Sequence, residues 1–407
     1  MLSLLITNAK NLYYRQKINE AGKDMKKFWA TIKSATNEKT KLSPDIKLLE
    51  IGGRMMNVSE TPITVSNFIN RFFTSVGDSL ADNILQKLQK TEEDMVNGYH
   101  PSFTVRDSIF FTPVSEEELL SAINSLNKDS APGPDGLSTK TLMKIKDCIL
   151  KPLLHIFNNS LQQGVFPENF KHANVKPFFK TGDKTKITNY RPISLTSNLA
   201  KALEKIVKKR IMDFFDHHEV LSQNQFGFRQ GRGTQDALFT LSSEISNAIE
   251  NNEKCITVFL DLAKAFDTVS HPILLRKLEA LGIRGNSNKW FETYLMGRKQ
   301  KVCLGEHKSE ELSTKYSVPQ GTVLGPPLYL VYCNELCNLP LQGKIISFAD
   351  DTAIVFRGKS WEEVFQLAEK ELRKVTKWLN ENLLTLNVKK NEIFNLLLNT
   401  GGSPHTK

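Results

Sequence analysis

The stretch of sequence that most constrains the fold is ISFADDTAIVF, residues 346–356, where two adjacent carboxylates interrupt an apolar run. The flanking residues predict two short strands, with Asp350 and Asp351 at or beside the turn between them. Aspartate favours turns because its side chain bonds the local backbone, so a solvated turn is one interpretation. The other is that a positive charge lies beside the pair, because adjacent like charges repel and burial strengthens the repulsion.

A third carboxylate follows another apolar strand. The segment CITVFL, residues 255–260, is short, β-branched and apolar on both faces, and Asp261 comes directly after it. If these strands share one sheet, Asp261 can face Asp350 and Asp351, because functional groups collect beyond the ends of strands. Three converging carboxylates need a cation, and a set of oxygen ligands suits Mg²⁺. Two such ions can clamp the attacking and leaving oxygens of a phosphoryl displacement.

The charge of the chain is unevenly distributed. Of 407 residues with a net charge of +10, residues 171–232 contain 13 Lys and Arg against 5 Asp and Glu. A solvated surface and a polyanion-binding face both explain this excess. No apolar run reaches 18 residues, so no membrane span is predicted, and the first residues make a poor signal peptide. The five cysteines lack metal-ligand spacing, and we interpret them as reduced thiols of an intracellular protein.

The remaining sequence predicts helices, a linker and one rigid loop. The loop is residues 128–138, where two Pro and two Gly exclude helix and central strand. Residues 91–108 are polar and contain Pro and Gly, so they predict a linker. Apolar periodicity predicts helices over residues 1–40, 64–90, 115–126, 138–163 and 195–217, and again from residue 263. Ser115 and Glu118 form the sequence pattern of a capping box at the third of these.

Five motifs in order resemble those of reverse transcriptases. They are the fingers motif and the A, B, C and D motifs, which here read NYRPISL (189–195), FLDLAKAFD (259–267), SVPQGTVLGPPLYLVYCNEL (317–336), FADD (348–351) and LTLNVKKNEI (384–393). Their spelling, together with SAPGPDGLS (130–138) and QFGFRQGRGTQDAL (225–238), resembles the enzymes of non-LTR (LINE-type) retrotransposons, in particular jockey-like elements. The resemblance covers about residues 115–395, with the reverse transcriptase domain itself at about residues 160–400.

The resemblance implies roles for the acids and for one lysine. Asp261 and Asp350 would be the primary metal ligands, and Asp351 would support them. The implied cofactor is a pair of Mg²⁺ ions, with Mn²⁺ as the substitute, serving attack of a primer 3′-hydroxyl on the α-phosphate of the nucleotide. Lys390 matches the D-motif lysine, a candidate proton donor to the leaving pyrophosphate.

The resemblance also implies a nucleotide site. Arg191 and Lys180 would hold the triphosphate, since a guanidinium binds phosphate bidentately, although Lys180 is equally well explained as a solvated loop lysine. Phe266 would pack under the incoming sugar and exclude a 2′-hydroxyl. Gln320 and Gly321 would lie at the nascent base pair, where glycine lets the backbone approach closely.

The implied partners are an RNA template, a DNA primer or target, and dNTPs, with no membrane. Arg229 and Arg232 would contact template or primer phosphates without reading sequence. Target-primed copying implies the nucleus and a cytoplasmic ribonucleoprotein by analogy with the family. The thumb and the endonuclease of the family would lie outside this chain.

The implied fold class is α+β, the fingers and palm of a right-hand polymerase. An antiparallel palm sheet would carry the carboxylates, backed by helices at residues 268–283 and 361–381. The expected organisation is a helical N-terminal extension, a loop motif with fingers, a palm and a flexible tail, over residues 1–110, 111–260, 261–398 and 399–407. One departure concerns the B motif, where Pro327 removes a backbone donor and predicts a kinked helix.

Three functions compete at this point. The first is an RNA-directed DNA polymerase with the roles given above. The second is a catalytically incompetent, truncated remnant that only binds nucleic acid through the basic residues 171–232. The third is an RNA-dependent RNA polymerase, against which Phe266 argues, because those enzymes place a polar residue near this position to accept a 2′-hydroxyl.

Overall fold

The computed structural model describes all residues except 1, 23–30, 32–45, 388–391 and 397–407. The chain divides into two compact units, residues 1–47 and 48–407. The first contains helix α1 (Leu2–Ala21). The second contains every other element described below, and it holds the predicted site.

The helices of the second unit are α3 (Pro62–Leu88), α4 (Glu92–Asn97), α5 (Glu116–Asn124), α6 (Thr139–Gln163), α7 (Asn198–His217), α8 (Thr234–Glu250), α9 (His271–Ala280), α10 (Asn286–Leu295), α11 (Gly325–Cys333) and α12 (Trp361–Glu381), with short 3₁₀ turns at Glu168–Phe170, Ile187–Asn189 and Leu336–Asn338. Its strands are β1 (Leu48–Ile51), β2 (Arg54–Asn57), β3 (His172–Phe179), β4 (Tyr190–Thr196), β5 (Lys254–Leu260), β6 (Lys299–Leu304), β7 (His307–Lys308), β8 (Leu312–Ser313), β9 (Lys344–Phe348), β10 (Asp351–Gly358) and β11 (Glu392–Leu396).

A four-stranded antiparallel sheet, in the order β11-β5-β10-β9, confirms that the strands flanking the three aspartates share one sheet. In its register, Thr352 at the start of β10 pairs with Leu260 at the end of β5. Asp351 pairs with Phe348 across the β9–β10 turn. Because antiparallel neighbours bring the end of one strand to the start of the next, Asp261 and the Asp pair lie at the same end of the sheet.

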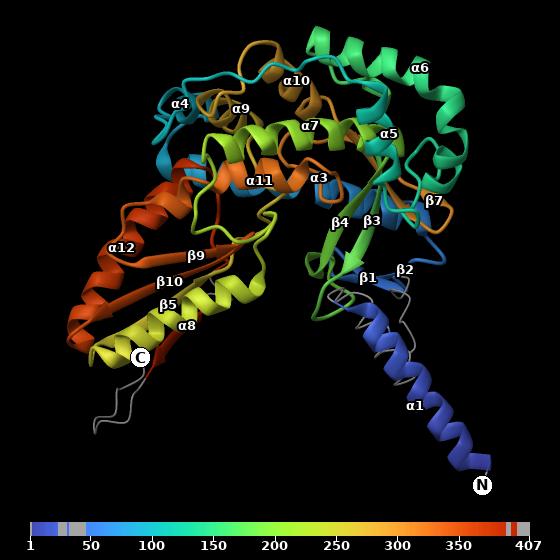
Figure 1. Cartoon of the computed structure of the whole chain (residues 1–407). Coiled ribbons are helices and arrows are strands. Elements are labelled where there is room, and N and C mark those ends of the chain that lie inside the picture. Colours follow the sequence, from blue (N-terminus) through green and yellow to red (C-terminus); the bar gives the residue numbers. More distant parts are fainter. Residues whose placement is uncertain (1, 23–30, 32–45, 388–391, 397–407) are drawn as a thin grey trace. The chain divides into compact units, whose positions relative to one another are not determined.

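Both faces of this sheet are covered by helices, and side-chain alternation along each strand separates the two cores. Ile256, Val258, Ile354 and Phe356 belong to the main core of the unit. Cys255 and Val355 point to the other face and form a smaller core with α8. Helices α12 and α8 pack along the sheet (Figure 1). The predicted helix at 361–381 is therefore confirmed as a backing helix, and α8 is the second one.

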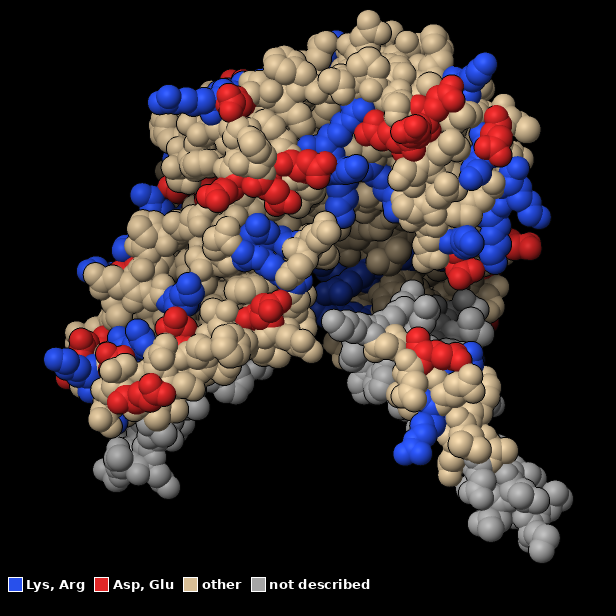
Figure 2. All heavy atoms as spheres, viewed as in Figure 1, with Lys and Arg blue, Asp and Glu red and all other residues tan. Residues whose placement is uncertain are grey.

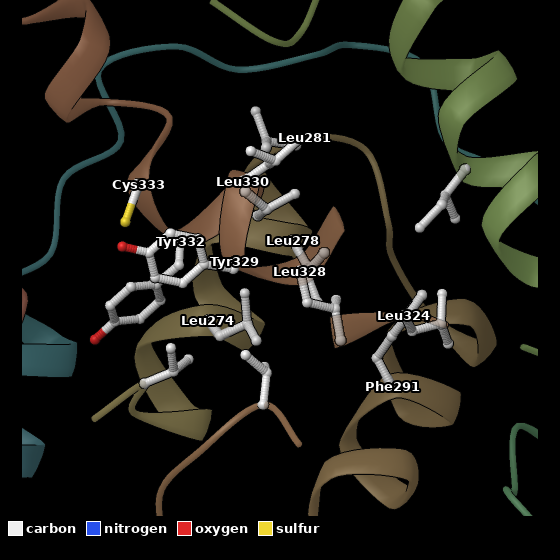
Figure 3. Packing of buried hydrophobic residues seen from close by; sticks show 14 of the residues in the cluster. Leu274, Leu278, Leu281, Phe291, Leu324, Leu328, Tyr329, Leu330, Tyr332 and Cys333 are labelled. Atoms are coloured by element: carbon white, nitrogen blue, oxygen red, sulfur yellow. The ribbon is translucent and has the colours of Figure 1, made fainter. Parts of the chain in front are cut away.

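The other predicted backing helix, residues 268–283, is shorter and packs elsewhere. It appears as α9, which packs mainly against α10 and α11. Figure 3 shows the contact: Leu274 and Leu278 of α9 lie beside Leu328 of α11, and Phe291 of α10 lies near Leu324. Placing this helix directly behind the sheet was wrong, because its apolar face is used by the helical core beside the sheet.

A second sheet is separate from the one that carries the carboxylates. Strands β4, β3, β6 and β7 follow one another, and β8 pairs with β6. Strand β3 is antiparallel to β4 and parallel to β6. Helix α3 packs against β6, β7 and β8. The chain before residue 111 thus contributes to this sheet's core, and residues 48–57 form a hairpin, so the prediction that residues 1–110 are helical does not hold there.

Several local predictions are settled by the structure. Helices α3, α5, α6 and α7 confirm four predicted helices within a few residues, and residues 128–138 form the predicted loop. The predicted linker at 91–108 contains α4, whose N-cap is Thr91. Residues 263–268 form turns instead of the predicted helix.

Helix α11 begins so close to Pro327 that the proline does not interrupt the helix. Its first residue is Gly325, so Pro327 lies in the first turn, where backbone N–H groups have no partner inside the helix. The predicted kink is therefore wrong, and the proline is accommodated at a position that suits it.

In the part of the chain that the structure describes, no helix combines the length and apolar character needed to cross a membrane. The five cysteines all fall within the described residues and are free thiols.

Candidate active site

The three aspartates gather where β5 ends and the β9–β10 hairpin turns. We call β9, β10 and the two residues between them the carboxylate hairpin. Asp261 directly follows β5, and Asp350 directly precedes β10. The pKa of Asp351 is raised, first by burial and then by the charges of Asp350 and Asp261. The three aspartates are therefore near enough for their charges to act on one another. Their convergence on a metal ion stays a prediction.

Asp261 is held by a residue that the sequence did not single out. The backbone N–H of Asn387 donates to the Asp261 carbonyl at 2.8 Å. The Asn387 side chain donates to Asp261 Oδ2 at 2.7 Å. This double contact fixes both the backbone and the carboxylate of Asp261. The only sequence signal for Asn387 was its position inside the predicted D motif, LTLNVKKNEI.

Two basic residues face the acids from the other sheet. Lys180 follows β3 and Arg191 lies on β4. Both positive charges act to lower the pKa of Asp351, which offsets part of the rise caused by burial and by the other two acids. We call β3, β4 and the loop joining them the basic hairpin. Figure 2 shows the molecule hollowed between the part carrying β9 and β10 and the part carrying β3 and β4, with Lys and Arg side chains in its depth. Lys180 and Arg191 are both exposed, so an anion can reach them.

Phe266 is part of an aromatic group beside the carboxylates. Its ring stacks on Tyr329 of α11, with centroids 4.4 Å apart and an interplanar angle of 18°. Phe228 meets the same ring edge-on at 6.3 Å. The charge of Asp350 contributes to the raised pKa of Tyr329, so this group adjoins the acids. Phe266 is half-buried, so one part of its surface faces outward while its packing fixes the ring.

Gln320 and Gly321 join the B motif to the basic hairpin. The Gln320 carbonyl accepts from the backbone N–H of Ser194 at 2.7 Å. Gly321 has φ of +108°, and a Cβ there would lie 2.6 Å from the Ser194 carbonyl oxygen. Glycine is therefore required for close packing against β4, which is a different reason from the predicted approach to a base pair.

A buried carboxylate beside Gln320 was missed. Asp267 is buried, and its Oδ1 accepts from the Gln320 side chain at 3.0 Å. Burial raises its pKa to about 6, against the lowering effects of Lys264, the Gln320 bond and Arg191. Asp267 closes the A motif FLDLAKAFD, but nothing in the pattern distinguishes a buried aspartate from a turn residue.

The two arginines predicted to touch nucleic acid also hold their own loop. Arg229 donates to the carbonyls of Leu221 and Ser222, at 3.3 and 2.8 Å. Arg232 donates to the Gln223 carbonyl at 2.6 Å and lies over the Phe226 ring. Lys390, the predicted proton donor, lies outside the described residues.

With this arrangement in view, the comparison with protein families is decisive. The family model described as reverse transcriptase (RNA-dependent DNA polymerase) matches residues 180–403, which is more than half of the chain. The chain belongs to this family. The matched range contains every predicted site residue from Lys180 to Lys390.

Several reverse transcriptases of mobile elements are similar to this chain. The RNA-directed DNA polymerase from mobile element jockey of Drosophila melanogaster is 34% identical over 261 residues, covering 62% of this chain and 28% of that protein. The probable RNA-directed DNA polymerase from transposon BS of the same species is 30% identical over 291 residues, covering 70% and 32%. The resemblance to jockey-like non-LTR retrotransposon enzymes is thus confirmed, and the chain spans about a third of these relatives.

The three aspartates offer a set of donors that a divalent metal ion can use. Among the residues that the structure describes, no group of three or more His, Cys, Asp or Glu side chains forms a ready-made metal cluster. The donor chemistry nevertheless fits, because Asp261, Asp350 and Asp351 offer only oxygen ligands and repel one another. A divalent cation would relieve that repulsion.

Proposed function

We propose that this chain contains the fingers and palm of an RNA-directed DNA polymerase that adds dNTPs to a primer 3′-hydroxyl on an RNA template. The single observation that carries the proposal is the gathering of Asp261, Asp350 and Asp351 at one end of a sheet, opposite Lys180 and Arg191. Acids and bases arranged in this way suit a negatively charged substrate that arrives with cations.

The residues divide the work of nucleotidyl transfer. Asp261 and Asp350, supported by Asp351, would hold two Mg²⁺ ions, or Mn²⁺ in their place, and these would stabilise the charge on the reacting phosphate. Lys180 and Arg191 would bind the triphosphate, and the rigid position of the nucleotide would favour in-line attack. The primer 3′-hydroxyl would release its proton to solvent as its oxygen bonds to the α-phosphorus, the bond to pyrophosphate would break, and Lys390 would supply a proton to that leaving group.

The remaining predicted residues would contact the sugar, the nucleotide and the nucleic-acid backbone. Phe266, fixed on Tyr329, would present a bulky ring to the sugar and disfavour a 2′-hydroxyl. Gln320 and Gly321 would support the nucleotide through β4. Arg229 and Arg232 would meet template or primer phosphates with the donors that their loop contacts leave available. By analogy with the family, this work would take place in the nucleus and in a cytoplasmic ribonucleoprotein.

Primer extension tests the proposal. The purified chain would receive oligo(dT) annealed to poly(rA), Mg²⁺ and dTTP, beside the Asp350→Ala variant. Extension by the unsubstituted chain and its loss in the variant are the expected results. If neither chain extends the primer while both bind the template–primer, the alternative of a remnant that only binds nucleic acid is favoured.

A further inference from the structure

The turn that presents Asp350 has a backbone that cannot complete its own hydrogen bonds. Ala349, the residue before Asp350, has φ of +60°, a left-handed conformation that is unusual for a residue other than glycine. Ala349 is also buried. A buried N–H or carbonyl must find a partner, and here the ladder between β9 and β10 supplies none, because it ends at Phe348 and Asp351.

Gln225 supplies both partners. Its Oε1 accepts from the Ala349 N–H at 2.8 Å, and its Nε2 donates to the Ala349 carbonyl at 3.2 Å. The same Oε1 accepts from the Gly227 N–H at 2.8 Å, which fixes the Gln225 side chain. Gln225 is only 4% exposed, so water does not compete for these bonds. A primary amide is suited to the task because it carries an acceptor and a donor in one plane.

The chain around Gln225 is shaped to reach the turn. The Phe226 N–H donates to the Ser347 carbonyl, and the Ser347 N–H donates to the Asn224 carbonyl, each at 2.8 Å. Residues 224–226 thereby pair in parallel with the end of β9. A Cβ on Gly227 would lie 2.2 Å from the Ala349 nitrogen, so only glycine allows this approach.

From these contacts we infer that Gln225 is a positioning residue for catalysis, which holds the Ala349 backbone so that Asp350 points toward Asp261. Gly227 makes the contact sterically accessible. The inference rests on the proposed function, and it adds a residue outside the carboxylate hairpin and the basic hairpin to the machinery. The next residue, Phe228, touches the Phe266 ring, so one short segment supports both the acids and the ring beside the sugar.

Asn334 provides a matched control. It is a buried amide that accepts from the Ser222 N–H and donates to the Val220 carbonyl, each at 2.8 Å. It therefore anchors the same segment a few residues earlier, and these two hydrogen bonds go to Ser222 and Val220, not to Ala349. Removing either amide should destabilise the fold to a similar degree, while only one removal should disturb the carboxylates.

The test compares the whole unsubstituted chain with Gln225→Met, Gln225→Glu and Asn334→Leu. Mn²⁺ binding, followed by electron paramagnetic resonance, is the first readout, and kcat and KM in primer extension are the second. Gln225→Met should lower kcat by about tenfold or more, because small displacements of reacting groups are costly, with weaker Mn²⁺ binding and little change in KM for template–primer. Asn334→Leu should lower the melting temperature comparably and retain Mn²⁺ affinity and kcat.

Gln225→Glu adds a readout that a purely structural role would not change. An ionised carboxylate can accept from Ala349 but cannot donate to it, whereas the protonated form can do both. The activity of Gln225→Glu relative to the unsubstituted chain should rise as the pH falls, and that of Gln225→Met should not.

If Gln225→Met retains Mn²⁺ affinity and kcat as Asn334→Leu does, the inference is overturned while the proposed function stands. If the unsubstituted chain neither binds Mn²⁺ nor extends a primer, the proposed function fails first and the inference fails with it.

Discussion

The carboxylate hairpin and the basic hairpin carry opposite charges and are built differently. Within the carboxylate hairpin, the backbone before Asp350 is fixed by a buried glutamine. Beside it, Asp261 is fixed by two bonds from Asn387. Lys180 and Arg191 are exposed side chains on a sheet, acting on Asp351 through space. Groups fixed in advance suit a role that requires exact geometry, whereas long exposed side chains keep rotamer freedom and suit the capture of a charged ligand.

The largest effect is expected on the acidic side. Asp261→Asn keeps the shape and can still accept from Asn387, but it removes one charge from the group. Primer extension should fall by about a thousandfold or more, because a fixed electrostatic contribution to the transition state is lost. Asp147→Asn, an exposed substitution on α6, is the control and should change nothing. Activity within tenfold of the unsubstituted chain would mean that the acids are not the catalytic centre.

A smaller, graded effect is expected on the basic side. Arg191→Ala should raise KM for the dNTP by about 10- to 100-fold, through loss of charge-assisted bonds to phosphate. The KM of Arg191→Lys should lie between those of the unsubstituted chain and Arg191→Ala, because lysine keeps the charge and loses the bidentate geometry. Lys186→Ala, in the loop of the same hairpin, serves as the control. If Arg191→Lys and Arg191→Ala are equally impaired, precise geometry matters on the basic hairpin too. The contrast between fixed acids and adaptable basic side chains would then be wrong.

A change in nucleotide selectivity is expected at Phe266, which lies beside the carboxylates. Phe266→Ala removes the ring from Tyr329 and opens space beside the acids. Discrimination between dGTP and GTP on a poly(rC) template should drop by about 10- to 100-fold, as expected when a steric barrier is removed. The ratio of kcat/KM values measures this, with the exposed Phe103→Ala as control. An unchanged ratio would assign Phe266 to packing alone.

The last effect concerns stability instead of activity, and it comes from Asp267, which contacts Gln320 and interacts with Arg191. Its pKa in the fold is about 6, above the value of about 4 for an unfolded aspartate. A raised pKa contributes stability that is fully present below pH 4 and is lost as the pH rises through 6. The loss is about 3 kcal/mol at most, by the difference between these values.

Asp267→Asn should therefore melt at a higher temperature than the unsubstituted chain at pH 8 and at nearly the same temperature below pH 4. Thermal melts across this range measure the difference, and Asp213→Asn, an exposed carboxylate on α7, should show no such trend. A constant offset at every pH would show that the pKa of Asp267 is the same in the folded and the unfolded chain, so that burial does not raise it.

Much of this protein follows from local sequence. The apolar runs beside the acids predicted β5, β9 and β10, since short β-branched segments form buried strands wherever the rest of the chain provides a partner. Helical periodicity likewise predicted α6 and α7. The order and spelling of the five motifs predicted the family. They also predicted the three aspartates, together with Lys180 and Arg191, whose charges act on one another in the structure.

Long-range contacts decided the rest. Gln225, Asn387 and Asp267 lie inside the sequence motifs, but their roles depend on partners far away in the chain or on burial, which a motif does not reveal. The same holds for α8, which covers the sheet in place of α9, and for Gly321, whose neighbour is the backbone of β4. A local pattern determines which surface of an element is apolar, but the partner of that surface is set only when the whole chain packs. The sequence therefore predicted the groups that we propose for the chemistry, and tertiary structure decided what holds them in place.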